Sequence, residues 1–305
     1  MKHFLIGSAT AIMLVLCPSH RAATAQTPSD SAATAGSHNL KEREAKMFST
    51  SAGYERYMGR WSRRLVPGYI EFAGVKNGDR VLDVGTGTGA VAAGIAATMP
   101  AAEIVGIDPS EAFISYAKNN VTSGRARFEI GDAQSLNFPD ASFDQTTALL
   151  VMNFIPDHDK AIREMRRATR PGGVVSACVW DYASGMEMIR TFWDEVVALV
   201  PSLEPKHQRN VKFAREGQLG ELWRKAGLLK VEEKPLVIEQ SFQSFDDYWQ
   251  PFLGQTGAAG ALVGTLSDDQ RRELEVRMRK RVLGTRDDGP FVLKARAWCV
   301  RGQAS

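Results

Sequence analysis

The chain has 305 residues, 44% of them hydrophobic and 24% charged, which is enough for one large domain with a substantial buried core. A formal net charge of +3 is too small to indicate nucleic-acid binding. The three cysteines form no CxxC motif or Cys/His cluster with zinc spacing, so we expect no metal site.

Residues 1–25 have the layout of a secretory signal peptide. A basic start precedes an apolar run at 4–17, which is too short to span a bilayer comfortably. Ala23 and Ala25 then supply small residues at positions −3 and −1 of a cleavage site. We therefore expect an exported, periplasmic protein.

Residues 26–46 are polar and rich in Ala, Ser and Thr, and we expect a disordered linker there. The folded domain is expected over 47–305. If the N-terminal segment is a true signal peptide, the mature chain begins at Gln26. The alternative is translation from Met47, which would leave the protein in the cytoplasm.

Strands and helices alternate between residues 80 and 180. Apolar runs predict strands at 80–85, 102–108, 125–131, within 142–155 and at 172–180. Amphipathic or Ala-rich segments predict helices at 88–100, 111–120 and 158–170, and Ser110 is a suitable N-cap for the second. This alternation predicts an α/β fold, a doubly wound parallel sheet with helices on both faces.

After residue 183 the alternation weakens. A helix is expected at 185–201, strands at 228–240 and 291–302, and mostly helical structure between the two strands. We expect the segment 240–285 to form a helical lid over the sheet edge, where substrate selectivity would arise. Residues 271–281 carry six basic residues and two glutamates, which favours a solvated helix face over a docking patch for an acidic partner.

The glycine-rich turn Gly85–Ala90 follows the first strand of the alternating region. Its spacing fits a dinucleotide-binding loop and also a loop that binds S-adenosylmethionine (SAM). Asp83 precedes the turn inside the strand, where a carboxylate would favour a cationic ligand such as SAM. Asp108 ends the second strand and suits a ribose, while Asp132 follows the third and suits an adenine amino group. An acidic residue at or near the end of each of three successive strands favours SAM over a dinucleotide.

Five segments resemble those of class I SAM-dependent methyltransferases, in the branch similar to ubiquinone and menaquinone biosynthesis enzymes (the type-11 methyltransferase domain). These segments are VLDVGTGTG (81–89), GIDPS (106–110), GDAQSLNFPDASFD (131–144), ATRPGGVV (168–175) and YERYMGRWSRRLVP (54–67). The resemblance covers about residues 47–300. It implies a seven-stranded, mostly parallel Rossmann-like sheet with a reversed last hairpin, and SAM as the cofactor.

The resemblance also implies site residues. The methionine end of SAM would lie against Gly85, Thr86 and Gly87, with Asp83 close by, and the ribose against Asp108, Pro109 and Ser110. Asp132 and Ala133 would meet the adenine. The sulfonium would lie beside Val151, Met152 and Asn153, and Tyr54 is a candidate for contact with the methionine carboxylate.

The methyl acceptor is less well defined. Weak candidates for a catalytic base are His158, Asp157, Asp181 and Tyr182. An apolar acceptor pocket is suggested by seven aromatic residues, most of which are expected in the core: Trp180, Tyr182, Phe192, Trp193, Tyr248, Trp249 and Phe252. We predict a small, apolar or amphipathic acceptor. The alternatives are an RNA methyltransferase, a non-catalytic SAM-binding protein and an NAD-dependent oxidoreductase.

Cys178 and Cys299 both lie in apolar, strand-like runs. Buried free thiols are the default expectation, and the sequence does not determine whether the two are bonded.

Overall fold

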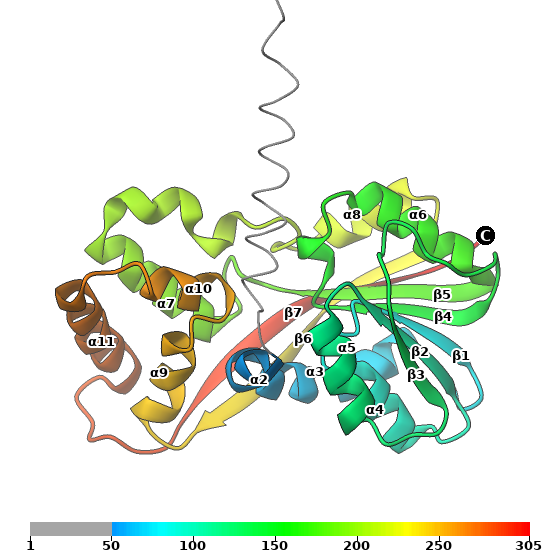
Figure 1. Cartoon of the computed structure of the whole chain (residues 1–305). Helices are drawn as coiled ribbons and strands as arrows, with labels where there is room; N and C mark the ends of the chain where they lie inside the picture. The colour runs from blue at the N-terminus through cyan, green and yellow to red at the C-terminus, as the bar shows by residue number, and fades with distance from the viewer. Residues whose placement is uncertain (1–50) are drawn as a thin grey trace, which may run out of the picture. The chain divides into compact units, whose positions relative to one another are not determined.

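A computed structural model describes residues 51–305 of the protein (Figure 1). The predicted signal peptide (1–25) and linker (26–46) lie outside the described residues. The strands are β1 Arg80–Val84, β2 Glu103–Asp108, β3 Ala126–Ile130, β4 Phe143–Leu149, β5 Thr169–Trp180, β6 Leu229–Phe242 and β7 Phe291–Gln303.

These strands form a seven-stranded sheet in the order β3-β2-β1-β4-β5-β7-β6. Strands β1 to β5 pair in parallel, whereas β7 is antiparallel to both of its neighbours, β5 and β6. The predicted α/β class and the reversed last hairpin are therefore confirmed. Because the parallel strands share a direction, the turns after β1, β2, β3 and β4 meet at one edge.

Helices cover both faces of the sheet. On one face lie α3 Arg60–Ala73, α4 Ala90–Thr98 and α5 Glu111–Asn120, and on the other α6 His158–Ala168 and α8 Gln218–Lys225 (Figure 1). Helix α6 shows why these segments are helical, since Ala161, Ile162, Met165 and Ala168 are buried along one side. Ser110 caps α5, as predicted, by accepting a hydrogen bond from the backbone N–H of Phe113.

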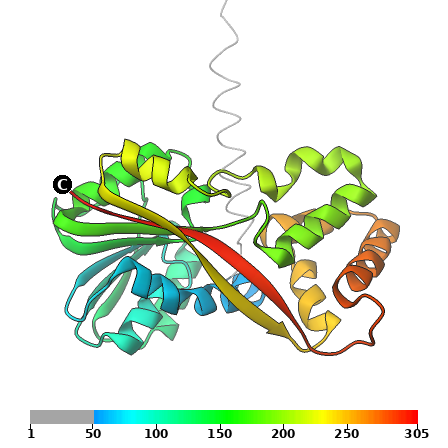
Figure 2. The same ribbon diagram turned by 180° about the vertical axis from the view of Figure 1, so that it is seen from behind.

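Four further helices form a group at the end of the β6–β7 hairpin, which we call the helical group (Figures 1 and 2). They are α7 Glu187–Leu199, α9 Phe245–Leu253, α10 Gly257–Val263 and α11 Asp268–Leu283. Short 3₁₀ segments, η3 Pro201–Lys206 and η4 Gln208–Asn210, follow α7. Phe192 of α7 stacks on Phe252 of α9, with ring centroids 4.8 Å apart, inside this group.

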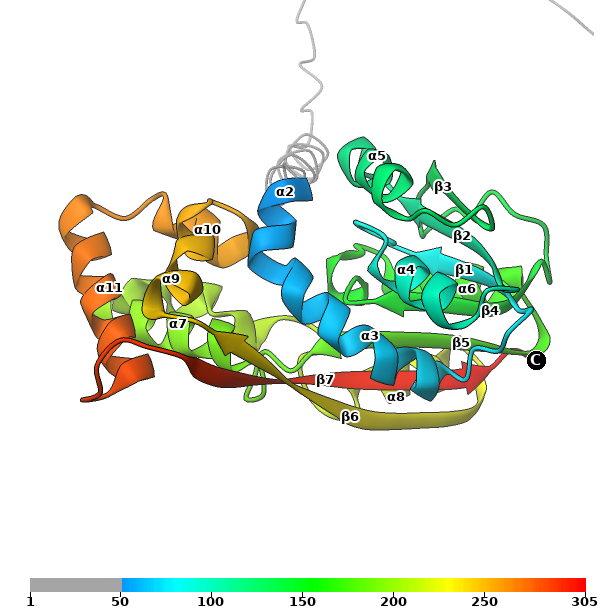
Figure 3. The same cartoon turned by 90° about the horizontal axis from the view of Figure 1, so that it is seen from below.

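The first described helices run between the helical group and the α/β part (Figure 3). Helix α2 Ser51–Tyr54 continues into a π-helical turn, η1 Glu55–Gly59, and then into α3. The Arg60 guanidinium makes two hydrogen bonds to the Asp247 carboxylate of α9, of 2.7 and 3.2 Å. This bidentate ion pair attaches α3 to the helical group.

Cys178 and Cys299 are register partners in the antiparallel β5–β7 pair and form a disulfide. Both side chains are completely buried, as expected, but the default expectation of free thiols is wrong. Between residues 51 and 305, none of the helices has the length and apolar character needed to cross a membrane.

Candidate cofactor site and acceptor cavity

The turn after β1 needs glycine for two different reasons. Gly85, Gly87 and Gly89 all have positive φ, at 67°, 55° and 86°. A Cβ on Gly85 would lie 2.4 Å from Cγ2 of Val151, so the turn packs directly against the end of β4. A Cβ on Gly87 would meet only a backbone oxygen at 4.0 Å, so the turn is open on that side.

Asp83 lies beneath this turn and is 1% exposed. Its carboxylate accepts hydrogen bonds from the hydroxyls of Thr86, at 2.7 Å, and Thr147, at 2.9 Å. Burial raises the pKa of Asp83 to about 6, against the lowering effect of these two hydrogen bonds. The carboxylate thus fixes the glycine turn to β4 and places a potential negative charge directly under it.

Asp108 joins the turns after β1 and β2. Its carboxylate accepts hydrogen bonds from the backbone N–H of Gly87, at 3.0 Å, and of Ser110, at 2.9 Å. Burial raises its pKa, since the residue is only 8% exposed. Pro109 is exposed beside it. A carboxylate that accepts one backbone hydrogen bond on each oxygen still has lone pairs for ribose hydroxyls.

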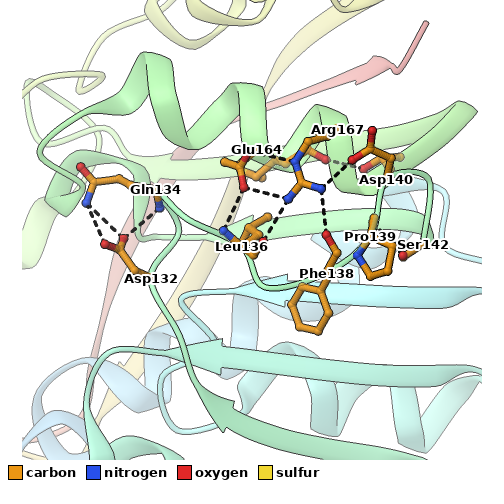
Figure 4. A network of polar contacts seen from close by, with 11 residues as sticks. Asp132, Gln134, Leu136, Phe138, Pro139, Asp140, Ser142, Glu164 and Arg167 are labelled. Atoms are coloured by element: carbon orange, nitrogen blue, oxygen red, sulfur yellow. Dashed lines mark hydrogen bonds and ion pairs between the residues drawn. The ribbon is translucent and has the colours of Figure 1, made fainter.

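Asp132 lies in the turn after β3 and is exposed, and Ala133 beside it is half-buried. The Asp132 carboxylate accepts hydrogen bonds from the backbone N–H of Gln134, at 2.8 Å, and from its side-chain amide, at 3.1 Å (Figure 4). The carboxylate therefore stabilises its own turn. Ile130, the last residue of β3, is 60% exposed and offers an apolar surface next to that turn.

The loop from β3 to β4 is held by Arg167 of α6 (Figure 4). The guanidinium donates hydrogen bonds to the carbonyls of Leu136, at 3.0 Å, and Phe138, at 2.8 Å, and it pairs with Glu164 and Asp140. Glu164 in turn accepts from the backbone N–H of Leu136. This cluster, which we call the Arg167 clamp, fixes the loop that carries Asp132.

The chain after β4 passes close to the glycine turn. Leu150 has a positive φ of 60°, which is rare for a leucine and is typical of constrained functional sites. A 3₁₀ turn, η2 Met152–Phe154, follows. The side-chain oxygen of Asn153 is buried and has no hydrogen-bond partner among residues 51–305. It is an acceptor left available for a ligand.

These strand ends therefore offer acceptor oxygens from Asp83, Asp108 and Asn153. Such a set suits the ammonium, sulfonium and ribose hydroxyls of SAM better than the pyrophosphate of a dinucleotide, which needs donors. The residues thus fit SAM, with Asp108 for the ribose and Asn153 for the methionine side.

A cavity of about 40 Å³ lies between η1, the end of β5 and the start of α10. It is lined by Tyr54, Tyr57, Met58, Leu150, Phe154, Trp180, Tyr182, Ile189, Gln208, Gly257 and Ala258, none of which carries a formal charge. We call it the acceptor cavity. The Tyr54 hydroxyl lies 3.0 Å from that of Ser62, and burial raises the pKa of Tyr54 to about 12.

The structure separates the candidate bases. Asp157 caps α6 by accepting from the backbone N–H of Lys160. Nε2 of His158 lies 3.3 Å from Nζ of Lys212. Burial lowers the pKa of His158, and the positive charge of Lys212 lowers it further. It does not line the acceptor cavity. Asp181 is buried in an ion pair with Arg296 and is also outside the lining.

Tyr182 does line the cavity, but burial raises its pKa. None of the four candidate bases combines a place in the cavity lining with a pKa suited to proton removal at neutral pH.

Sequence reasoning identified Trp180 and Tyr182 as candidate pocket residues but missed Tyr57. Five other aromatic candidates are buried outside the cavity lining: Phe192, Trp193, Tyr248, Trp249 and Phe252. Tyr57 lies three residues after Tyr54 within the YERYM segment, and that spacing on a helix was the available indication.

The sheet order and the acceptor oxygens at its edge define a methyltransferase of the class that uses SAM. Residues 81–173 match the family model described as "Methyltransferase domain". A demethylmenaquinone methyltransferase of Geobacillus kaustophilus is 30% identical over 179 residues, which cover 54% of this chain and 76% of the relative. The chain belongs to the class I SAM-dependent methyltransferases, and SAM is its cofactor.

A ubiquinone/menaquinone biosynthesis C-methyltransferase of Geobacter sulfurreducens is 38% identical over 119 residues. That match covers 37% of this chain, and the chain spans less than half of that relative, 45% of its length. Among solved structures, phosphoethanolamine N-methyltransferase 2 of Haemonchus contortus superposes with a TM-score of 0.55 at 18% identity, over 87% of this chain and 60% of that one. A Bacillus halodurans protein superposes with a TM-score of 0.52 at 17% identity, over 78% of this chain and 98% of that one. Both structural likenesses concern the fold.

Proposed function

We propose that the protein transfers the methyl group of SAM to a small, apolar or amphipathic metabolite that contains a ring. The observation that supports this most directly is the acceptor cavity, whose lining is aromatic or aliphatic apart from Gln208 and the tyrosine hydroxyls and includes no formal charge. The names of the two curated relatives, one of which refers to ubiquinone/menaquinone biosynthesis and the other to demethylmenaquinone, also favour a ring-containing acceptor.

SAM supplies a methyl group on a sulfonium, which leaves as a neutral thioether. The protein therefore has to align an acceptor with the methyl group and exclude water. Leu150 and Phe154, on either side of Asn153, line the acceptor cavity. The chain after β4 thus lies at both the proposed sulfonium position and the acceptor cavity. Gly257 and Ala258 of α10, within the segment 240–285, form part of the wall of the acceptor cavity. Their position supports our proposal that this segment acts as a lid.

The test is incubation with methyl-labelled SAM and a cell extract from which small molecules have not been removed. We expect label in an organic-soluble metabolite with wild-type protein and a loss of at least tenfold with Asp108→Ala. Label only in RNA would support the nucleic-acid alternative. Absence of label from every fraction, despite SAM binding by calorimetry, would support a non-catalytic protein.

One observation weighs against the RNA alternative. Four of the six basic residues in 271–281 form ion pairs with nearby acids: Arg271, Arg272, Arg277 and Arg279. Their charges are largely neutralised locally, as expected for a solvated helix face.

We also propose that the protein works in an exported, oxidising compartment. The Cys178–Cys299 disulfide supports this, because stable disulfides are rare in cytosolic proteins. Intact-mass analysis of protein from its native source tests the proposal. A mature chain that begins at Gln26 is expected, whereas one that begins at Met47 would contradict it.

A further inference from the structure

Two residues that line the acceptor cavity each carry a buried donor without a partner among residues 51–305. Tyr57 is 4% exposed and Trp180 1% exposed, and both line the cavity. Neither the Tyr57 hydroxyl nor the Trp180 indole N–H has a hydrogen-bond partner among residues 51–305. Leaving a buried donor unpaired is unfavourable, so such groups commonly await a ligand or water.

Two other polar groups of the lining are already engaged. The Gln208 carbonyl oxygen accepts a hydrogen bond of 2.7 Å from the indole N–H of Trp193. The Tyr54 hydroxyl is paired with Ser62. Tyr57 and Trp180 therefore supply two buried donors without a partner beside the cavity, and its lining contains no Asp, Glu, His or Lys that would remove a proton from an acceptor.

We propose that Tyr57 and Trp180 are positioning residues that bind the oxygen of an acceptor which reacts as its phenolate or enolate anion. The inference rests on the proposed methyltransferase function and specifies its substrate class. The acceptor loses its proton to water before it is enclosed, and the two donors stabilise the resulting oxyanion, as hydrogen bonds to a charged form do.

The transfer then balances without a protein base. An electron pair of the anion, on oxygen or on a conjugated ring carbon, forms the new bond to the methyl carbon. The carbon–sulfur bond breaks, and its electron pair stays on sulfur. An anion and a sulfonium cation become two neutral products, and transfer to a ring carbon is completed by loss of the ring proton to water.

A ring requires more space than the cavity now provides, since about 40 Å³ holds one or two waters. The contacts of Tyr57 indicate where the cavity must widen. A Cβ on Gly257 would lie 2.9 Å from Cε1 of Tyr57, and Phe252 meets the Tyr57 ring edge-on at 5.6 Å. Acceptor binding therefore requires η1 and α10 to move apart.

The test measures how the protein changes the ionisation of a bound phenol. 4-Nitrophenol is the probe, because its phenolate has a separate absorption band, and S-adenosylhomocysteine is present at saturation. We expect the wild-type protein to bind the phenolate at least tenfold more tightly than the phenol, which lowers the apparent pKa of the probe by at least one unit. 4-Nitroanisole, which cannot ionise, should bind at least tenfold more weakly than the phenolate.

The variants Tyr57→Phe and Trp180→Phe should each reduce the preference for phenolate about tenfold. Trp249→Phe is the matched control, because Trp249 is equally buried and its indole N–H is also unpaired, but it lies outside the cavity lining. The control should keep the wild-type preference. If Trp180→Phe fails to fold, Tyr57→Phe carries the test, since it removes a single oxygen.

Calorimetry with S-adenosylhomocysteine distinguishes failure of the proposed methyltransferase function from failure of the inference about Tyr57 and Trp180. If this cofactor product does not bind the wild-type protein, the proposed methyltransferase function fails. If it binds normally but neither probe binds, or the two probes bind equally, or Trp249→Phe loses as much preference as the cavity variants, the inference about Tyr57 and Trp180 is wrong.

Discussion

Asp83 is an acid that the fold buries without a cationic partner in the described part of the chain. Its two hydrogen bonds come from neutral hydroxyls, Thr86 and Thr147. Desolvation therefore outweighs them and raises the pKa to about 6. A positively charged ligand beside the turn would reverse this effect, so the state of Asp83 should be coupled to SAM binding.

The first prediction concerns pH. Because the pKa of Asp83 is raised above its unfolded value, the native state holds an extra proton between about pH 4 and 6. The stability of the free protein should therefore fall as pH rises through this range, by up to about 3 kcal/mol. SAM affinity should instead rise as pH increases through about 6, because the cation favours the ionised carboxylate. Calorimetric titration between pH 5 and 8 checks this.

Asp83→Asn is the matched variant, since the amide keeps an oxygen for Thr86 or Thr147 but does not ionise. It should show weaker SAM binding at pH 8 and little dependence on pH. An Asn variant with the wild-type pH profile would mean that another group controls the affinity.

The second prediction concerns Asp108. Asp108→Ala removes the acceptor for ribose hydroxyls and frees the backbone N–H groups of Gly87 and Ser110. SAM binding should weaken at least tenfold, equivalent to about 1.4 kcal/mol or more. Glu103→Ala, at the opposite end of β2, is the control and should leave affinity unchanged. Calorimetry showing equal affinity for Asp108→Ala and wild type would exclude the ribose contact.

At the scale of elements, the sequence predicted every strand and most helices, because hydrophobic periodicity is a local property. It did not predict the π-helical turn at Glu55–Gly59 or the Arg167 clamp. The clamp depends on contacts between α6 and a loop about 30 residues earlier in the chain. The acceptor cavity has the same origin, since its walls come from residues near positions 57, 180 and 257.

The third prediction concerns the Arg167 clamp. Arg167→Met keeps the apolar stem but removes the donors to the Leu136 and Phe138 carbonyls and leaves Glu164 without its cation. We expect a loss of about 1–3 kcal/mol in the free energy of unfolding, since hydrogen bonds to charged groups are involved. SAM affinity should fall several-fold, because the loop after β3 carries Asp132.

Arg163→Met is the control for the clamp. Arg163 lies on the exposed side of the same helix, so its loss should leave stability and SAM affinity close to wild type. Urea denaturation and calorimetry measure the two quantities. Equal effects of the two substitutions would show that α6, rather than the clamp, is what they disturb.

At the scale of the whole molecule, the long strands β6 and β7 run from the α/β part to the helical group (Figure 2). The strand β7 follows the helical group in sequence and returns to the sheet beside β5, antiparallel to it. The sequence placed Cys178 and Cys299 on strands but not opposite one another, because pairing register between strands 121 residues apart depends on the complete topology.

The last prediction concerns this disulfide, which closes a loop of 121 residues between the neighbouring strands β5 and β7. In the chain-entropy model a loop of this length stabilises the folded state by roughly 4–5 kcal/mol. In a chain that starts at Gln26, the double variant Cys178→Ala/Cys299→Ala should therefore be several kcal/mol less stable to urea. Reductant should lower the stability of the wild type towards that of the double variant and leave the double variant unchanged. Alkylation in denaturant should find no free thiol in the oxidised wild type. Two reactive thiols, together with a stability that does not respond to reductant, would show that the disulfide is absent. That result would also remove the support for an oxidising compartment.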